Sequence, residues 1–307
     1  MPDYDSRRAL LVDAFTDAPL AGNAAGVVPD ASGLEAEQMQ AVAAELGASE
    51  TAFLRPSDDA DRAVRYFTPS QEVDLCGHAT VASHALLAME GELDEGEHTL
   101  ETQVGVLDIE IDGRTVWMTQ NPPEIRELDD LDYGTVADAL GTREEGLRGL
   151  SADLPLARAT TGLPFVMIPV EYLADLSEME PDMAAIEAVS DEYDCAGVYA
   201  FTFDTLDAES TLHARMFAPG AGVPEDPVTG TASGACGAYL DRFGALDPTP
   251  ERMRFEQGHF VDRPGLVHVN ASDATAEGRV RVGGEAVVAL DGEIRVPAAE
   301  DDDIIEA

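Results

Sequence analysis

Short apolar or alternating segments predict the strands of this chain, and they recur in both halves. We expect strands at residues 9–14, 51–54, 64–67, 100–110, 115–119, 165–170, 197–203, 213–217, 254–258, 265–269, 280–282 and 286–290. Asp112-Gly113 has the composition of a tight turn between two of these strands. Predicted helices alternate with the strands, which indicates an α/β organisation.

Two segments of small and apolar residues predict buried central helices. Residues 77–89 carry few polar side chains apart from His78 and His84, and residues 230–240 are also mostly small. A helix that is apolar on most sides is normally buried, so we expect a curved sheet around each one. Further helices are predicted at residues 34–46, before the capping residue Gly47, and at residues 182–189.

A motif that occurs twice relates the two halves. Arg65-Tyr66-Phe67-Thr68-Pro69 precedes the first small-residue segment, and Arg215-Met216-Phe217-Ala218-Pro219 precedes the second. An acidic stretch that we expect to be irregular lies between each motif and a glycine, Gly77 or Gly230. A repeat this long indicates two related domains rather than a solenoid. Backbone N–H groups at two such helix starts would suit a small carboxylate between the domains.

The predicted domains follow from this duplication. The first covers residues 1–121 and is completed by a C-terminal strand near 286–298, and the second covers residues 122–285. Asn121-Pro122-Pro123-Glu124 has the composition of a linker between them. Residues 299–307 form an acidic tail that we expect to be solvated.

The composition narrows the cellular setting and the chemistry. The chain has 61 acidic residues and 18 basic residues, all of them arginine, and a net charge of −43. This charge argues against nucleic acid or an anionic membrane as a partner, and is typical of a cytoplasmic protein from a halophile. Without lysine there is no Schiff-base lysine and no phosphate-loop lysine. The spacing of Cys76, Cys195 and Cys236 predicts neither a metal site nor a disulfide framework.

Four polar residues near the repeated motifs are candidates for chemistry, each with a structural alternative. His78, in the first turn of a buried helix, would be neutral and could relay a proton, or be a core histidine. Asp226 could serve the site or cap a turn, and Thr231 could hold a carboxylate or cap a helix. Glu50 alone would be read as a solvated residue, and Cys76 as a small buried hydrophobe.

Together these residues fall in segments that resemble the PhzF-like (phenazine biosynthesis) isomerase family. The similar segments are residues 12–17, Gly22-Asn23, residues 49–53, Phe67-Thr68-Pro69, residues 74–80, residues 225–230, and Glu256-Gln257-Gly258 with Arg263-Pro264. They occur in the order of the family and span most of the chain. The resemblance implies a diaminopimelate epimerase-like fold, with two pseudo-symmetric domains of mostly antiparallel strands and an active site in the cleft between them.

The resemblance also implies roles for individual residues. Glu50 would be the catalytic acid/base, with His78 and Asp226 as its partners. Gly77, Ala79, Thr80, Gly230 and Thr231 would bind the carboxylate of the substrate. The reaction would be an isomerisation of a dihydro-hydroxyanthranilate-like compound, without cofactor or metal. Two departures are modest: Ala24 stands where the family usually has Pro, and Thr231 where it usually has Ser.

Two further functions stay open at this point. One is an epimerase or racemase on the same fold, although two-thiol enzymes need a cysteine at each helix start and Cys76 is matched by Thr229. The other is a binding protein that has kept the fold without activity. We expect a homodimer, because that is the commonest closed assembly.

The acidic composition makes one prediction about stability. In molar salt the Debye length is about 3 Å, so repulsion among the surface carboxylates is screened. We expect the melting temperature, followed by circular dichroism, to rise steeply from low to multimolar KCl. A melting temperature indifferent to KCl would contradict the halophilic interpretation.

Overall fold

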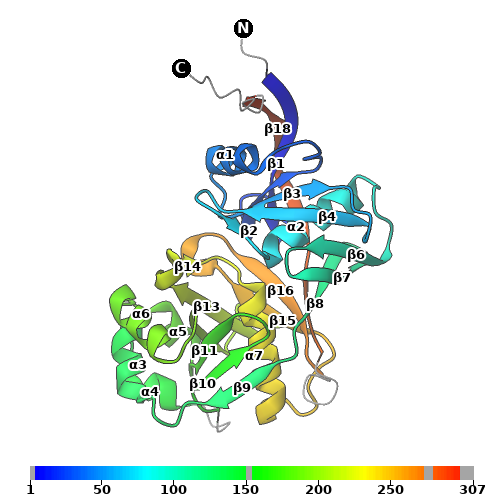
Figure 1. The fold of residues 1–307 in the computed structure, drawn as a ribbon. Helices are drawn as coiled ribbons and strands as arrows, with labels where there is room; N and C mark the ends of the chain where they lie inside the picture. The colour runs from blue at the N-terminus through cyan, green and yellow to red at the C-terminus, as the bar shows by residue number, and fades with distance from the viewer. Residues whose placement is uncertain (1–3, 150–153, 273–278, 298–307) are drawn as a thin grey trace, which may run out of the picture.

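One hydrogen-bonded network of strands runs through both halves of the chain. The structure, a computed structural model, describes residues 4–149, 154–272 and 279–297, and within these ranges 18 strands form a single network. It folds into two lobes, one built around α2 (Gly77–Met89) and one around α7 (Gly230–Phe243), as Figure 1 shows.

The elements have the following bounds. The strands are β1 (Tyr4–Ala14), β2 (Asn23–Val28), β3 (Thr51–Arg55), β4 (Arg62–Phe67), β5 (Glu72–Val73), β6 (Gly96–Thr102), β7 (Gly105–Asp112), β8 (Thr115–Gln120), β9 (Glu124–Glu127), β10 (Ala157–Thr160), β11 (Pro164–Pro169), β12 (Gly197–Thr202), β13 (Leu212–Ala218), β14 (Val223–Asp226), β15 (Met253–Gln257), β16 (Gly265–Asn270), β17 (Val280–Gly284) and β18 (Ala286–Pro297). The other helices are α1 (Ala36–Leu46), α3 (Tyr133–Leu140), α4 (Glu144–Arg148), α5 (Leu173–Ser177), α6 (Met183–Glu192), η1 (Pro219–Ala221) and η2 (His259–Val261).

The two lobes repeat one pattern of strand pairing. Along β1, β2, β3, β4, β6, β7 and β8, neighbours pair as antiparallel, parallel, antiparallel, parallel, antiparallel and antiparallel. The series β10, β11, β12, β13, β15, β16 and β17 has the same sequence of pairings. The fold is therefore mixed α and β with two pseudo-symmetric, mostly antiparallel sheets, as the sequence predicts.

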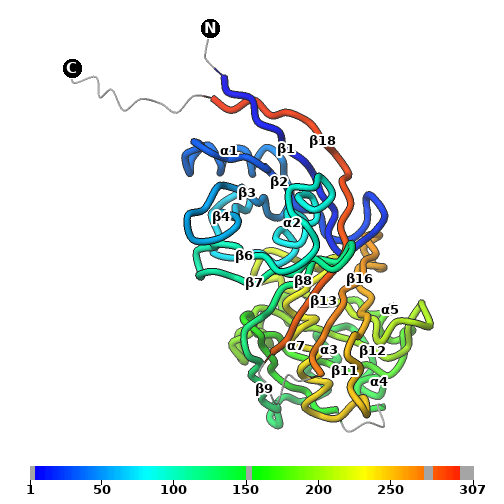
Figure 2. Tube along the Cα trace, turned by 90° about the vertical axis from the view of Figure 1, so that its right-hand side faces the viewer, coloured from blue at the N-terminus to red at the C-terminus, as the bar shows by residue number. Residues whose placement is uncertain are grey.

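The lobes are joined where the last strands of the two series meet. β8 pairs antiparallel with β17, from Val116 opposite Gly284 to Gln120 opposite Val280. After this junction the chain crosses over twice, since β9 pairs with β10 and β18 returns to pair with β1. β1 and β18 form the long ribbon that carries both ends of the chain (Figures 1 and 2). The predicted boundaries at 121/122 and 285/286 fall at these crossings, and the division into domains there stays a prediction.

The central helices are buried because almost all of their side chains are small or apolar. Every residue from Ala79 to Leu87 of α2 is buried, as is every residue from Ala232 to Leu240 of α7. α2 contacts β1, β2, β3, β8 and β18, and α7 contacts β10, β11, β16 and β17. α1 lies on the outer face of the first sheet, and α3, α5 and α6 pack on the outer face of the second.

Some predicted elements need correction. Residues 100–110 are not one strand: β6 ends at Thr102 and β7 begins at Gly105, because Gly105 adopts a φ of 118° and the chain turns back. The stretches before the central helices are also not fully irregular, since β5 and β14 pair with β4 and β13. The patterns missed β2, β9, β10 and the helices between residues 133 and 177. The predicted acidic tail, residues 299–307, lies outside the described residues. In the described parts of the chain, no helix combines the length and apolar character needed to cross a membrane.

The arginine of each repeated motif is a structural clamp. Arg65 donates two hydrogen bonds to Glu72, at 2.6 and 2.7 Å, and Arg215 donates two to Glu225, at 2.9 and 2.8 Å. Each guanidinium also lies over the phenylalanine ring of its own motif. A planar guanidinium suits this two-pronged contact with a carboxylate. The clamp therefore holds β5 and β14 against their neighbours in both lobes.

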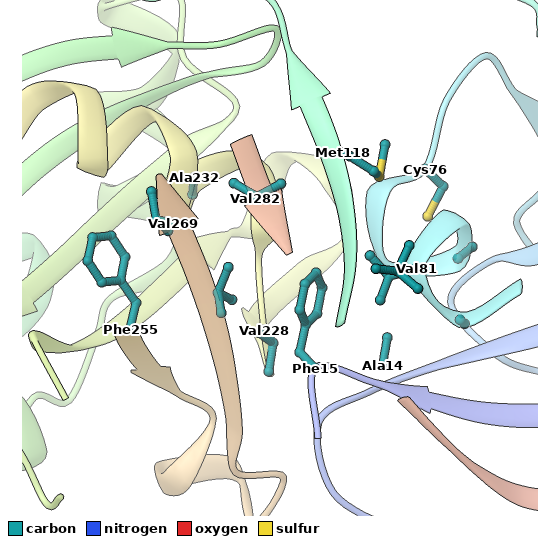
Figure 3. Close-up of a cluster of buried hydrophobic side chains, with 14 of the residues drawn as sticks. Ala14, Phe15, Cys76, Val81, Met118, Val228, Ala232, Phe255, Val269 and Val282 are labelled. Carbon is teal, nitrogen blue, oxygen red and sulfur yellow. The ribbon is translucent and has the colours of Figure 1, made fainter. Parts of the chain in front are cut away.

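Phe15 fills the junction between the lobes. Its side chain is only 1% exposed, and Figure 3 shows it between Ala14 and Val81 of the first lobe and Val228 and Val282 of the second. Its backbone is bonded to the second half of the chain, since its N–H donates to the Glu285 carbonyl at 2.7 Å and its carbonyl accepts from Leu266 N–H at 2.8 Å. A methyl group on Gly284 would lie 2.3 Å from Phe15 Cδ1, so only glycine fits there.

This position predicts a large loss of stability on truncation. We expect Phe15→Ala to lower the free energy of unfolding by about 3–5 kcal/mol, the usual cost of emptying a buried aromatic site. Urea unfolding in molar KCl measures this change in the free energy of unfolding. Tyr4→Ala, at a residue 52% exposed on β1, is the matched control and should change it by less than about 0.5 kcal/mol. Equal unfolding midpoints for the two variants would disprove the bridging role of Phe15.

Candidate active site

A cavity of about 470 Å³ lies between the lobes and brings predicted site residues together. Glu50, His78, Asp226 and Thr231 all line it. Its polar wall also contains Asn23, Ser49, Thr229 and Arg263, and its apolar wall contains Leu163, Phe165 and Met216. Residues from far apart in the chain thus meet around a space of the size that takes a small molecule.

Glu50 and His78 form the wall from the first lobe. Glu50 immediately precedes β3, and its carbonyl accepts a hydrogen bond from Gly26 N–H at 2.9 Å, which fixes its backbone beside β2. Its Oε2 lies 3.4 Å from His78 Nε2. The hydroxyl of Ser49 lies 3.2 Å from the same nitrogen. The side chains of Glu50 and His78 are 24% and 12% exposed, so each presents only a small surface to the cavity.

Asp226 faces this pair from the second lobe and is held by a polar network. Asn23 Nδ2 donates to Asp226 Oδ1 at 2.9 Å, and the Thr229 hydroxyl donates to Asp226 Oδ2. Gln257 orients Thr229 through both ends of its side-chain amide. The Gln257 Oε1 accepts a hydrogen bond from Thr229 N–H at 3.1 Å. The Gln257 Nε2 donates to the Thr229 hydroxyl at 3.1 Å and to the Asp226 carbonyl at 2.8 Å. Both carboxylate oxygens of Asp226 therefore have fixed directions.

The surroundings shift the pKa values of Asp226 and His78 in opposite directions. Burial raises the pKa of Asp226 to about 7; hydrogen bonds from Thr229 and Asn23 oppose the rise and the negative charge of Glu50 adds to it. Burial lowers the pKa of His78, and the charge of Glu50 offsets part of that effect. Near neutral pH, His78 is neutral and Asp226 is partly protonated, so the cavity holds groups that can give and accept protons.

The predicted carboxylate-binding residues differ in how they meet the cavity. Thr231 lines it in the first turn of α7. Gly77 and Gly230 begin the two central helices, and Ala79 is fully buried. Thr80 is also buried: its hydroxyl donates to the Cys76 carbonyl at 2.7 Å and meets the Tyr66 hydroxyl at 2.5 Å, and its N–H donates to the same carbonyl. Thr80 thus has its polar groups bonded inside the helix and its core.

Cys76 and Thr229 occupy the same place in the two lobes, the residue before each central helix. Cys76 Sγ lies 3.4 Å from His78 Nδ1. Burial raises the pKa of the Cys76 thiol well above its ordinary value, and the charges of Glu50 and Asp226 add to the rise. The thiol is therefore protonated at neutral pH. Ligand-type atoms of Glu50, Cys76 and His78 all lie within 4.8 Å of one another, close enough to hold a metal ion.

Sequence reasoning missed the residues that support the predicted site. Asn23 and Gln257 stood in segments noted for the family resemblance, and Ser49 is the neighbour of Glu50, but none was assigned a role. Arg263 also came from such a segment: it donates to Asp13 Oδ1 at 2.7 Å and to the Gly22 carbonyl at 3.0 Å, which fixes the loop before Asn23. Their position in matched segments was the available signal.

Comparison with known proteins identifies the family of this chain. The family model described as phenazine biosynthesis-like protein matches residues 12–292. The chain is 37% identical to an uncharacterized isomerase, YfhB, of Bacillus subtilis, over 91% of this chain and 95% of that protein. It is 31% identical to the trans-2,3-dihydro-3-hydroxyanthranilate isomerase of Pseudomonas chlororaphis, again over 91% and 95%.

Solved structures also point to the PhzF family. The crystal structure of a PhzF-family phenazine biosynthesis protein from Bacillus anthracis superposes with a TM-score of 0.84 and 32% identity, over 94% of this chain and 99% of that one. A hydroxyproline epimerase from Agrobacterium vitis has a TM-score of 0.59 at 16% identity, over 97% and 93%, a likeness of fold alone. The predicted fold is confirmed, and the chain belongs to the PhzF-like family of phenazine biosynthesis-like proteins, whose named members are isomerases.

Proposed function

We propose that this protein is a cofactor-independent isomerase that moves a proton on a small cyclic or unsaturated carboxylate, with Glu50 as the acid/base. The observation that carries the proposal is the pair of carboxyl groups from opposite lobes. Glu50 and Asp226 line the same cavity; burial raises the pKa of Asp226, and the charge of Glu50 adds to the rise. Two interacting carboxyl groups resist ionising together, so one is available as a base while the other keeps its proton.

In the proposed reaction Glu50 removes a proton from a carbon next to an unsaturated system. The electrons of the broken C–H bond delocalise over that system, and the same carboxyl group returns its proton at another carbon. The net change is a shifted double bond, with no redox step. His78, 3.4 Å from Glu50, holds the carboxyl group in one orientation. Leu163, Phe165 and Met216 provide an apolar wall for the unsaturated part of the substrate.

The proposed substrate carries a carboxylate that binds near the start of α7. The first N–H groups of a helix have no acceptor within it, and the helix dipole favours an anion there. Thr231 adds a hydroxyl at the cavity wall, and protonated Asp226 has a hydrogen to donate to a substrate oxygen. The named activity of the Pseudomonas chlororaphis relative supports a dihydro-hydroxyanthranilate-like substrate class.

The epimerase alternative is weaker because it lacks a second base of the right kind. Cys76 is the only thiol at either central helix start, and its high pKa keeps it protonated. Its counterpart Thr229 already donates its hydrogen to Asp226. One protonated thiol opposite a hydroxyl does not make a two-thiol site.

Three further properties form part of the proposal. The excess of carboxylates and the absence of lysine support a cytoplasmic protein that works in concentrated salt. A homodimer remains the expected assembly. No partner other than a small-molecule substrate is needed for the proposed chemistry.

The role of Glu50 predicts the effect of removing its acidity. We expect Glu50→Gln to lower kcat by at least about 10²-fold, the usual scale of a general acid/base contribution. The assay incubates the protein with cyclic dihydro-hydroxy or amino acids in D₂O and molar KCl, and follows deuterium entry and the double-bond shift by NMR. Glu45→Gln, at an exposed position on α1, is the matched control. Equal deuterium entry in Glu50→Gln and the control would remove Glu50 from the mechanism.

The raised pKa of Asp226 predicts a basic limb in the pH profile. Because the protonated form persists up to about pH 7, we expect kcat/KM to fall as the pH rises through about 7. Asp226→Asn keeps a neutral hydrogen-bond donor that does not titrate, so this limb should disappear in the variant. An identical basic limb in both proteins would show that another group titrates.

A further inference from the structure

Three side chains with metal-binding atoms converge at one end of the cavity. Glu50 Oε2 lies 3.4 Å from His78 Nε2, and Cys76 Sγ lies 3.9 Å from the same nitrogen. Within the described ranges, this is the one group of three His, Cys, Asp or Glu side chains whose ligand atoms are mutually within 4.8 Å. Glu50 and His78 line the cavity, so a small ion has a route to their side chains.

The spacing is close to that of a tetrahedral zinc site. Zinc binds sulfur at about 2.3 Å and nitrogen or oxygen at about 2.0–2.2 Å, which places its ligand atoms roughly 3.3–3.6 Å apart. The Glu50–His78 separation already falls in that range, and the Cys76–His78 separation exceeds it by a few tenths of an ångström. The Glu50 and Cys76 ligand atoms lie within 4.8 Å of each other, so side-chain rotations that draw the three atoms together would complete three ligands. A fourth position would open into the cavity, which Glu50 and His78 line.

The ligand types select the class of metal. A thiolate, an imidazole and a carboxylate suit Zn²⁺ and Co²⁺, whereas Mg²⁺ and Ca²⁺ prefer oxygen ligands alone. The surroundings also favour a cation, since Asp226 lies nearby and its charge, like that of Glu50, acts on Cys76.

We propose that Glu50, Cys76 and His78 form a zinc-type inhibitory site, in which a bound divalent ion occupies the carboxylate needed for proton transfer. On binding, the S–H bond of Cys76 breaks, its proton passes to the buffer, and a metal–sulfur bond forms. His78 binds through its neutral imidazole and Glu50 through its carboxylate. Cys76 and His78 are close in the sequence, but Glu50 joins them only through the fold, so the spacing of the cysteines alone did not point to this group.

The first experiment detects the metal without any enzymatic assay. Co²⁺ is titrated into the full-length protein in molar KCl with excess MgCl₂, which occupies the many surface carboxylates. We expect one Co²⁺ per chain, an absorption band from thiolate-to-cobalt charge transfer, and release of about one proton per ion. Zn²⁺ should displace the Co²⁺ and abolish the band. Absence of the charge-transfer band would overturn the proposal, because it requires a cobalt–sulfur bond.

Variants then identify the sulfur. Cys76→Ser should remove the band and weaken Zn²⁺ binding by at least about 10–100-fold, the range seen even when groups supporting a ligand are lost. Cys195→Ser is the matched control, because Cys195 lies in the second lobe outside the cavity, and it should bind like the unchanged protein. Circular dichroism confirms that each variant is folded. A band that survives in Cys76→Ser or vanishes in Cys195→Ser would place the metal elsewhere.

The inhibitory part rests on the proposed function and has its own readout. Micromolar Zn²⁺ should stop deuterium entry into the substrate, and a chelator should restore it. If the metal binds as described but no substrate exchanges hydrogen, the proposed isomerisation fails while the metal site stands. If exchange proceeds with Zn²⁺ bound at one ion per chain, the inhibitory role is overturned.

Discussion

Burial of the two central helices is the constraint on which the rest of this structure depends. α2 and α7 are small-residue helices enclosed along most of their length, so each needs a sheet curved around it. Their first turns cannot be enclosed in the same way, because the leading N–H groups lack partners within the helix. His78 and Thr231, one from each first turn, face the shared cavity. Enclosing the helices therefore leaves the cavity between the lobes as the place where polar groups gather.

The duplication explains the scaffold, and the differences between its copies underlie the proposed chemistry. The Arg–Glu clamps of the two motifs are equivalent, as is the order of strand pairing. At the helix starts the copies differ, with Cys76 against Thr229 and His78 against Thr231. Asp226 is the last residue of β14, which pairs with β13. Glu50 comes from the loop before β3, outside the repeated motif. An asymmetric cavity inside a symmetric frame suits a reaction that moves a proton with one principal base.

The same cavity has to keep carboxyl groups close together in a chain that is already strongly acidic. Asp226 is half-buried, so solvent screens it only weakly from Glu50; its partial burial and that charge both raise its pKa. The hydrogen bonds from Asn23 and Thr229 hold it in place in spite of that repulsion. A divalent cation relieves the same repulsion, which connects the proton chemistry of the site with its proposed affinity for metal. Surface carboxylates, by contrast, are separated by water and respond to salt.

The sequence by itself determined the two central helices, most of the longer strands and the family. A helix of small and apolar residues can be recognised as buried from its composition, and the predicted helix at residues 77–89 has the same ends as α2. The Arg-x-Phe-x-Pro repeat predicted two related lobes. Glu50, His78, Asp226 and Thr231 were named from the resemblance and do meet at the cavity. Local pattern did not reveal β14, because four residues with two carboxylates and a proline carry no strand period. Only the tertiary structure decided that Gln257 orients Thr229 and that Cys76 lies beside Glu50, because these contacts join segments far apart in the chain. It also decided that Thr80 is held inside its helix, because that depends on which way a buried side chain turns.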